Sequence, residues 1–365
     1  MGESRSVPSP DEASMEYVRV GEGPSLSRVI RGGWQLAGGH GEIAEARAVD
    51  DLIACADAGI TSFDCADIYT GVEALMGRFR TEYGRRRGAR ALSALRVHTK
   101  FVPDLSSLAT IERRDVEAIV DRSLRRLGLE RLDLVQFHWW DYAEPRLFEV
   151  ADWLGSLARE GKVGDIGGTN FDTDHLSALL DAGVPLVSMQ VQYSLLDARP
   201  AKRMVRVATE RGVALLAYGT VAGGFLGDRW LGVPEPEPAA PLENRSLTKY
   251  RLVIEEFGGW ARYQALLETL REVADRHDSD IATVASRAVL DRDGVAGVIV
   301  GARNRSHLGA NLAVAALRLT DEDRADIDAV VGEAALLPGD VYALERDRNS
   351  AHGAIMRYEL NREAR

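Results

Sequence analysis

Four side chains of different chemistry occur where short apolar runs end: Asp64, Tyr69, Lys100 and His138. A tyrosine hydroxyl can protonate an oxygen that gains negative charge, provided that its usual pKa of about 10 falls to suit neutral pH. A lysine ammonium supplies positive charge nearby, and an aspartate paired with that ammonium keeps it charged in a partly buried place. A histidine N–H facing the same oxygen stabilises the developing charge. Each residue alone has an ordinary structural explanation, but together they predict an active site that protonates an oxygen.

The elements that position these side chains are eight short runs of Val, Ile and Leu, which alternate with longer segments of helical period. The expected strands are Val29–Trp34, Thr61–Cys65, Leu95–Phe101, Leu132–His138, Val163–Thr169, Leu186–Val191, Val213–Tyr218 and Val295–Val300. None shows polar alternation, as expected of parallel strands that helices cover.

Repeated strand and helix units that close after eight predict an α/β fold, the (β/α)₈ TIM barrel. Glycines punctuate the pattern because they stand between an expected helix and the following strand, for example at Gly128 and Gly161. Active sites of this fold lie at the carboxyl ends of the strands. The four chemical side chains are therefore expected at one mouth of the barrel.

Three segments fall outside the repeat. Residues 1–16 are polar and proline-containing, which predicts a disordered arm. A long loop, Asp228–Gly259, follows the seventh strand and carries a proline-rich stretch, so it is expected on the active face as a lid, binding loop or disordered excursion. We expect one barrel domain over residues 17–331 and a C-terminal extension over residues 332–365, which packs across the barrel or against a partner subunit.

The composition narrows the class of protein. The chain has 365 residues, 45% of them hydrophobic, and a formal net charge of -11, which argues against nucleic acid and anionic membranes as partners. No signal peptide and no membrane-spanning run is recognised. Two cysteines, Cys55 and Cys65, make neither a disulfide framework nor a zinc signature, and the histidines lack metal-binding spacing. We therefore expect a cytoplasmic protein without metal; the oligomeric state is left open.

The motifs at the strand ends resemble those of the aldo-keto reductases. The matching segments are Phe63–Tyr69 with Glu73, Thr99–Phe101, Gln136–His138, Gly167–Phe171 and Val298–Arg303. The resemblance implies an NAD(P)H-dependent carbonyl reductase on a barrel, and no G-x-G-x-x-G or P-loop is found. The resemblance implies that Tyr69 is the acid, that Lys100 and Asp64 modulate the acidity of Tyr69, and that His138 orients the carbonyl. Some relatives that reduce carbon–carbon double bonds have glutamate where this chain has His138.

The resemblance also assigns cofactor contacts by position. The nicotinamide carboxamide matches Thr169, Asn170 and Gln190, and the ring stacks on Tyr218. The pyrophosphate loop is Gly219–Leu226, and the contacts expected from it are Gly219, Thr220, Gly223 and Leu226. The adenosine phosphate matches Gly301, Arg303, Asn304 and His307, and the adenine matches Asn311. Gly33 and Trp34 complete the set.

Arg303 favours NADPH because it can pair with a 2′-phosphate, although NADH is not excluded. His307 and Ala310 depart from the residues common in the family at these positions, which weakens that preference. Aromatic side chains at Trp34, Trp139 and Trp140 favour an apolar or aromatic aldehyde or ketone as the small-molecule substrate. Two alternatives stay open: a regulatory subunit that binds NADP(H) but turns over little, and a reductase for a keto-sugar or secondary metabolite.

Overall fold

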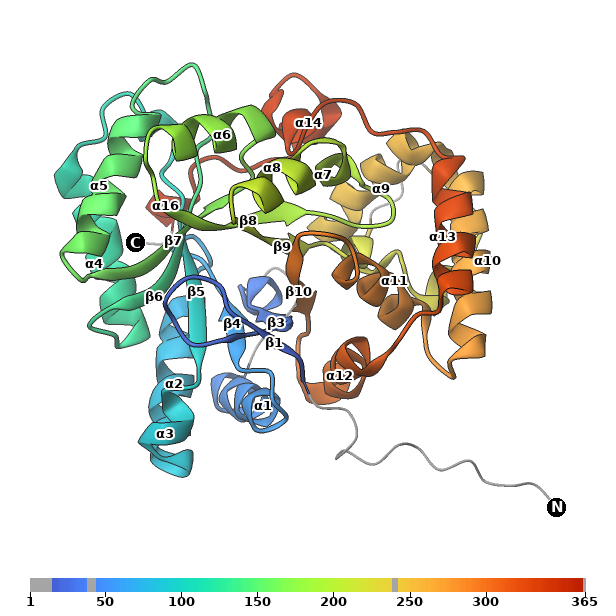
Figure 1. The fold of residues 1–365 in the computed structure, drawn as a ribbon, viewed down its shortest axis with the longest axis horizontal. Helices are drawn as coiled ribbons and strands as arrows, with labels where there is room; N and C mark the ends of the chain where they lie inside the picture. Colours follow the sequence, from blue (N-terminus) through green and yellow to red (C-terminus); the bar gives the residue numbers. More distant parts are fainter. Residues whose placement is uncertain (1–14, 38–43, 238–241, 364–365) are drawn as a thin grey trace.

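The computed structural model describes residues 15–37, 44–237 and 242–363. Eight parallel strands form a closed barrel in the order β10-β3-β4-β5-β6-β7-β8-β9, with helices around it (Figure 1). The strands are β3 (Val29–Gly32), β4 (Ser62–Asp64), β5 (Arg96–Phe101), β6 (Leu132–Phe137), β7 (Val163–Thr169), β8 (Leu186–Gln192), β9 (Ala214–Tyr218) and β10 (Val295–Gly301). The predicted (β/α)₈ barrel is confirmed, and each of the eight strands lies where the apolar runs predict it, within two residues at either end.

The helices follow the strands in the expected alternation. They are α1 (Glu45–Asp57), α2 (Val72–Arg87), α3 (Ala89–Leu92), α4 (Arg113–Leu127), α5 (Leu147–Arg159), α6 (Thr173–Asp181), α7 (Arg199–Lys202), α8 (Met204–Glu210), α9 (Arg245–Phe257), α10 (Gly259–Arg276), α11 (Ile281–Leu290), α12 (Leu308–Ala316), α13 (Asp321–Gly332), α14 (Ala343–Arg346), α15 (Ala351–Ala354) and α16 (Leu360–Glu363). Gly128, at φ 63°, ends α4 in the left-handed region that an ordinary side chain disfavours. No described helix is long and apolar enough to cross a membrane.

A short hairpin that the sequence pattern does not reveal closes the amino end of the barrel. It pairs β1 (Tyr17–Val18) with β2 (Leu26–Ser27) in antiparallel register. Residues 1–14 lie outside the described residues, but Met15 is 7% exposed in the main core and Glu16 pairs with Arg28. Residues 15 and 16 therefore belong to the fold and not to the expected arm.

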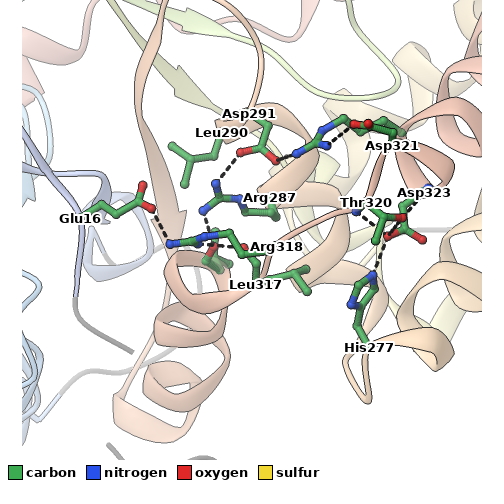
Figure 2. Close-up of polar contacts among 12 residues, drawn as sticks. Glu16, His277, Arg287, Leu290, Asp291, Leu317, Arg318, Thr320, Asp321 and Asp323 are labelled. Atoms are coloured by element: carbon green, nitrogen blue, oxygen red, sulfur yellow. Dashed lines mark hydrogen bonds and ion pairs between the residues drawn. The ribbon is translucent and has the colours of Figure 1, made fainter. Parts of the chain in front are cut away.

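Polar contacts join the described N-terminus to the last barrel helices (Figure 2). Arg318 bonds Glu16 and three carbonyl oxygens at the end of α12, and Arg287 bonds Asp291 and two carbonyls of the same helix end. Thr320 is the N-cap of α13. Asp323 Oδ2 accepts from the N–H and the hydroxyl of Thr320 and lies 2.6 Å from Nε2 of His277. The arginine contacts satisfy carbonyl groups that the end of α12 otherwise leaves unpaired.

The expected long loop after the seventh strand contains a helix, α9. Asn244 accepts a hydrogen bond from the N–H of Leu247 and so begins the helix. The buried positions of α9 recur at helical spacing: Leu247, Tyr250, Val253, Ile254 and Phe257. The expected lid, binding loop or disordered excursion over Asp228–Gly259 is therefore helical in its second half, where an apolar period follows the proline-rich stretch. Residues 238–241 of that stretch lie outside the described residues.

The C-terminal segment crosses the carboxyl end of the barrel after α13, passing through α14 and α15 to α16 (Figure 1). Asp340 accepts from the N–H and hydroxyl of Thr173 at the start of α6. Further along, Glu359 accepts from Ser106 in the segment that follows β5. The segment therefore packs across the barrel mouth, one of the two places expected for it.

Candidate active site

An ion pair between strands β4 and β5 forms the centre of the site. Lys100 Nζ lies 2.7 Å from Asp64 Oδ2 and donates to the carbonyl of Cys65 at 2.8 Å. Both charged side chains are almost fully buried. Burial lowers the pKa of Lys100, but Asp64 and Tyr69 together raise it above its ordinary value. The ammonium therefore stays charged at neutral pH.

Two glutamine amides hold the other oxygen of Asp64. Gln136 and Gln190 both donate to Asp64 Oδ1, at 2.9 and 2.7 Å, and Gln190 also donates to Gln136. Gln136 lies in the segment Gln136–His138 that resembles the aldo-keto reductases, but the sequence alone predicts no role for its side chain. In this arrangement the Nε2 of Gln190, expected at the nicotinamide carboxamide, is engaged with the carboxylate that orients Lys100.

Tyr69 lies on the loop between β4 and α2, with its ring beside the ammonium. The Nζ of Lys100 is 5.1 Å from the ring centroid, and the ring of Trp34 packs edge-on at 5.1 Å. Burial raises the pKa of Tyr69, and the Lys100 charge acts in the opposite direction without cancelling it. The expected fall in the pKa is therefore wrong, because burial outweighs the nearby cation. The phenol remains protonated at neutral pH, as an acid must.

His138 follows β6 and presents one ring nitrogen without a partner. Its Nδ1 lies 3.1 Å from the carbonyl oxygen of Thr169, and Nε2 is buried with no hydrogen bond among the described residues. Burial lowers the pKa of His138 to about 3, and the Arg346 guanidinium acts in the same direction. Since a carbonyl only accepts, Nδ1 carries the hydrogen in this arrangement. Nε2 of the neutral ring is then an acceptor, whereas an N–H donor was expected there.

The C-terminal segment adds an aromatic wall that the sequence analysis assigned no role. The ring of Tyr342 packs edge-on against His138 at 5.8 Å, and Tyr342 is 4% exposed. Its backbone has φ 61°, an unfavourable conformation for a bulky residue. Arg346, four residues further along, anchors this segment because its guanidinium donates to the carbonyls of Trp139, Trp140 and Asn170.

A buried charge cluster ties the same segment to the loop after β9. Glu345 accepts two bonds from Arg199, which is itself paired with Asp197. Lys249 of α9 lies 3.4 Å from Glu345 and 5.6 Å from the ring centroids of both Tyr218 and Tyr342. Burial lowers the pKa of Lys249. The cluster links the segment that carries Tyr342 to the strand expected to hold the nicotinamide.

The residues expected at the nicotinamide lie together at the ends of β7, β8 and β9. Thr169 and Gln190 are paired in register on neighbouring strands, and Tyr218 Oη donates to Asn170 Oδ1 at 2.9 Å. Asn170 adopts φ 63°, which turns its side chain towards Tyr218. This grouping fits a ring stacked on Tyr218, with polar groups at its edge.

The glycine-rich loop after β9 matches only part of its expected contacts. Gly219 and Gly223 have φ of 75° and 67°, and a side chain on either would overlap Tyr250. Thr220 Oγ1 instead pairs with Ser286 of α11 at 3.0 Å, and Leu226 is fully buried in the core with its N–H bonded to Val221. The structure does not place the side chains of Thr220 and Leu226 at a cofactor surface.

The loop after β10 presents basic groups to solvent. Gly301, Arg303, Asn304 and His307 are all exposed, and Asn304 caps the short turn that follows by accepting from Ser306 N. Asn311 is 7% exposed, and its Nδ2 has no partner among the described residues. An unpaired buried amide and exposed cations fit an adenosine phosphate, so the donor set suits a dinucleotide.

The three tryptophans expected at the substrate separate into two groups. Trp34 packs on Tyr69, and Trp140 packs edge-on against His138 at 4.3 Å, so both adjoin side chains of the candidate site. Trp139 is fully buried and packs against Phe137. The structure does not place Trp139 at the mouth. Gly33, the remaining cofactor residue, is buried and donates its N–H to Asp64 O.

Comparison with known proteins identifies the family of this barrel. The model of the aldo/keto reductase family matches residues 28–331. The chain belongs to the aldo/keto reductase family. Its members are oxidoreductases that use nicotinamide cofactors.

Individual relatives are distant. The chain is 26% identical to aldo-keto reductase YhdN of Bacillus subtilis over 325 residues, covering 87% of this chain and 94% of that protein. It is 30% identical over 260 residues to flagellar radial spoke protein 5 of Chlamydomonas reinhardtii, covering 62% of this chain but only 49% of that protein. The fold matches that of a glycerol dehydrogenase, AKR11B4 of Gluconobacter oxydans, with a TM-score of 0.72, 24% identity and coverage of 89% and 97%.

Proposed function

We propose that this protein reduces an aldehyde or ketone to an alcohol, with Tyr69 as the general acid. The observation that carries the proposal is the geometry around Tyr69: a protonated phenol beside an ammonium that a buried aspartate holds at 2.7 Å. When the carbonyl carbon is reduced, its oxygen gains negative charge, and the phenol hydrogen transfers to that oxygen. The Lys100 charge stabilises the phenolate that forms. Bound NADPH would supply the hydride.

His138 acts at the same oxygen, in a way that depends on its tautomer. With Nδ1 bonded to Thr169 O, the free Nε2 accepts a hydrogen bond and so holds the hydroxyl of the alcohol. To donate to a carbonyl substrate, the ring has to place its hydrogen on Nε2 and give up the bond to Thr169. The arrangement seen therefore favours the alcohol complex, and the site supports oxidation as well as reduction.

The cofactor preference that we propose is NADPH. Exposed Arg303 and His307 can meet a 2′-phosphate beside the unpaired amide of Asn311. One relative, 23% identical over 321 residues, is an NADH-specific methylglyoxal reductase of Escherichia coli, so NADH remains the competing cofactor. Both cysteines are free and buried, which suits the reducing cytoplasm that we propose as its location.

The test is NADPH oxidation at 340 nm against aromatic aldehydes, ketones and keto-sugars, beside fluorescence titrations with NADPH and NADH. We expect turnover of at least one carbonyl class and tighter binding of NADPH. Tight NADPH binding with no turnover of any carbonyl contradicts the proposal and supports a regulatory subunit that binds the cofactor. Tighter binding of NADH contradicts the cofactor preference alone.

A further inference from the structure

The loop that carries Tyr69 is held from two sides. On the side of the ion pair, Lys100 donates to the carbonyl of Cys65 at 2.8 Å. On the other side, Asp67 Oδ2 accepts from the N–H of Val102 at 3.1 Å and from Nδ2 of Asn361 at 2.7 Å. Asn361 belongs to α16, 294 residues further along the chain. The C-terminal helix therefore contacts the catalytic loop directly.

Asn361 is bonded through both its backbone and its amide. Its N–H donates to Asp104 Oδ1 at 2.7 Å, and its Nδ2 also donates to Val102 O at 2.7 Å. Its Oδ1 accepts from the guanidinium of Arg122. Asn361 is 5% exposed. The side chain of Asn361 is therefore held in one place, because both of its amide atoms are bonded inside a buried polar cluster.

Asp67 depends on these partners. It is fully buried, and burial raises its pKa to about 7, with Glu73 of α2 acting in the same direction. The bonds from Val102 and Asn361 act in the opposite direction, as does Arg122 of α4. Its Oδ1 has no hydrogen-bond partner among the described residues. Loss of the Asn361 amide therefore removes a hydrogen bond from Oδ2 of this buried carboxyl group.

Tyr69 is two residues beyond Asp67 in a tightly turned loop. The N–H of Tyr69 donates to Ala66 O at 3.0 Å, and the N–H of Val72 donates to Tyr69 O at 3.0 Å. These bonds restrict the backbone between Asp67 and Tyr69. A displacement of Asp67 is therefore passed to the phenol.

We propose that Asn361 is a positioning residue, which sets the place of the Tyr69 hydroxyl by holding Asp67. The inference rests on the proposed role of Tyr69 as the acid. It assigns the C-terminal helix a part in the reaction although no atom of Asn361 is placed at the substrate. Misplacing a catalytic group by about 1 Å costs up to about 100-fold in rate.

The test is a double-mutant cycle of Asn361→Ala and Asp67→Ala in the full chain. Each single variant is expected to lower kcat about 10- to 100-fold, with the NADPH dissociation constant unchanged. The double variant is expected to be no slower than the slower single variant, because both act through one contact. Glu359→Gln is the matched control: Glu359 holds the same tail to Ser106 at 3.0 and 2.7 Å, away from the Tyr69 loop. Its kcat is expected to stay near that of the wild type.

Hydrogen–deuterium exchange of residues 65–71 gives a readout that needs no turnover. Exchange is expected to rise in Asn361→Ala and to stay unchanged in Glu359→Gln. Unchanged exchange in Asn361→Ala, a wild-type kcat or additive effects in the cycle overturn the inference. If Asn361→Ala does not fold, Asn361→Gln, which keeps the amide but misplaces it, carries the same expectations. A wild type without turnover overturns the proposed function, and the exchange result then still decides whether Asn361 holds the loop.

Discussion

Strand β5 carries two buried cations that face opposite ends of the barrel. Arg96 pairs with Asp165 and Lys100 pairs with Asp64, each at 2.7 Å. The two pairs differ in what surrounds them. Arg96 donates to the carbonyls of Val20 and Pro24 in the N-terminal hairpin. Asp165 accepts from two backbone N–H groups of the same hairpin, at 3.0 to 3.2 Å.

The pair at the carboxyl end is arranged differently. Lys100 has one backbone acceptor, Cys65 O, and its charge faces the ring of Tyr69. Nearby, His138 Nε2 has no partner in the described structure. A pair whose neighbours are backbone groups fixes a chain segment, whereas a pair beside an acid and an unpaired nitrogen is prepared for a reactant. Similar ion pairs thus hold a chain segment at one end of the barrel and adjoin the proposed acid at the other.

Between the two pairs lies His98, at the position on β5 midway between Arg96 and Lys100. Both of its ring nitrogens lack partners among the described residues. Burial lowers the pKa of His98 well below its usual value, and the two cations act in the same direction. A neutral ring therefore separates the two charged ends.

The largest expected effect is on activity at the carboxyl end. Lys100→Met removes the charge that stabilises the phenolate of Tyr69, so we expect kcat to fall by about 1,000-fold, within the usual range for a lost acid–base group. Asp64 keeps its two glutamine donors but loses its cation, so we expect a loss of about 3–5 kcal/mol of unfolding free energy and compare kcat per folded molecule. Steady-state kinetics and circular dichroism check both points; a variant within tenfold of wild-type kcat contradicts the role of Lys100.

At the amino end the corresponding change acts on stability. Arg96→Met leaves Asp165 buried without its cation, and removing one partner of a buried ion pair costs about 3–5 kcal/mol of unfolding free energy. Activity per folded molecule is expected to stay near that of the wild type. Urea unfolding and active-site titration test this; loss of activity in fully folded protein contradicts the division between the two ends.

A smaller effect is expected at the aromatic wall. Tyr342→Ala removes the ring that packs against His138. We expect KM for an aromatic aldehyde to rise about fivefold, because the ring that packs against His138 is lost and one buried aromatic contact is worth about 1 kcal/mol beyond its area, while the NADPH dissociation constant changes little. An unchanged KM contradicts a role of the Tyr342 ring in holding His138 for the substrate.

The smallest expected effect near neutral pH is a pH dependence of stability. The pKa of His138 is about 3 in the folded protein and about 6.5 when unfolded. Between these values the unfolded chain binds one more proton, so stability falls as the pH falls from 6.5 towards 3. His138→Asn is expected to remove about one proton from the uptake on unfolding in this range, as denaturation at several pH values can measure. An unchanged pH slope contradicts a neutral His138.

The barrel and the grouping of Asp64, Tyr69, Lys100 and His138 at one mouth could be predicted because their signals are local. Most strands are rich in Val, Ile and Leu, and Asp64, Lys100 and His138 lie within one residue of the ends of their strands. The hairpin of β1 and β2 could not be predicted from the sequence, because strands of two residues have no measurable period. The position of Trp139 was within reach of prediction, since neighbours on a strand face opposite sides and His138 faces inward.

Other parts of the site depend on contacts between distant segments. Asn361 meets Asp67 across 294 residues, and Arg346 meets Trp139 across 207, so no local pattern marks either contact. The hydrogen position on His138 follows from the carbonyl of Thr169, and the pKa of Tyr69 follows from burial. Both are properties of the packed structure and not of sequence spacing.

The most direct test of the account compares two tyrosines that each lose only a hydroxyl. Tyr69→Phe is expected to lower the single-turnover rate of carbonyl reduction by at least about 100-fold, with NADPH binding unchanged. Tyr342→Phe keeps its ring against His138 and is expected to stay within threefold of the wild type, since about 0.65 kcal/mol corresponds to that factor. A Tyr69→Phe variant as fast as the wild type contradicts the assignment of Tyr69 as the acid.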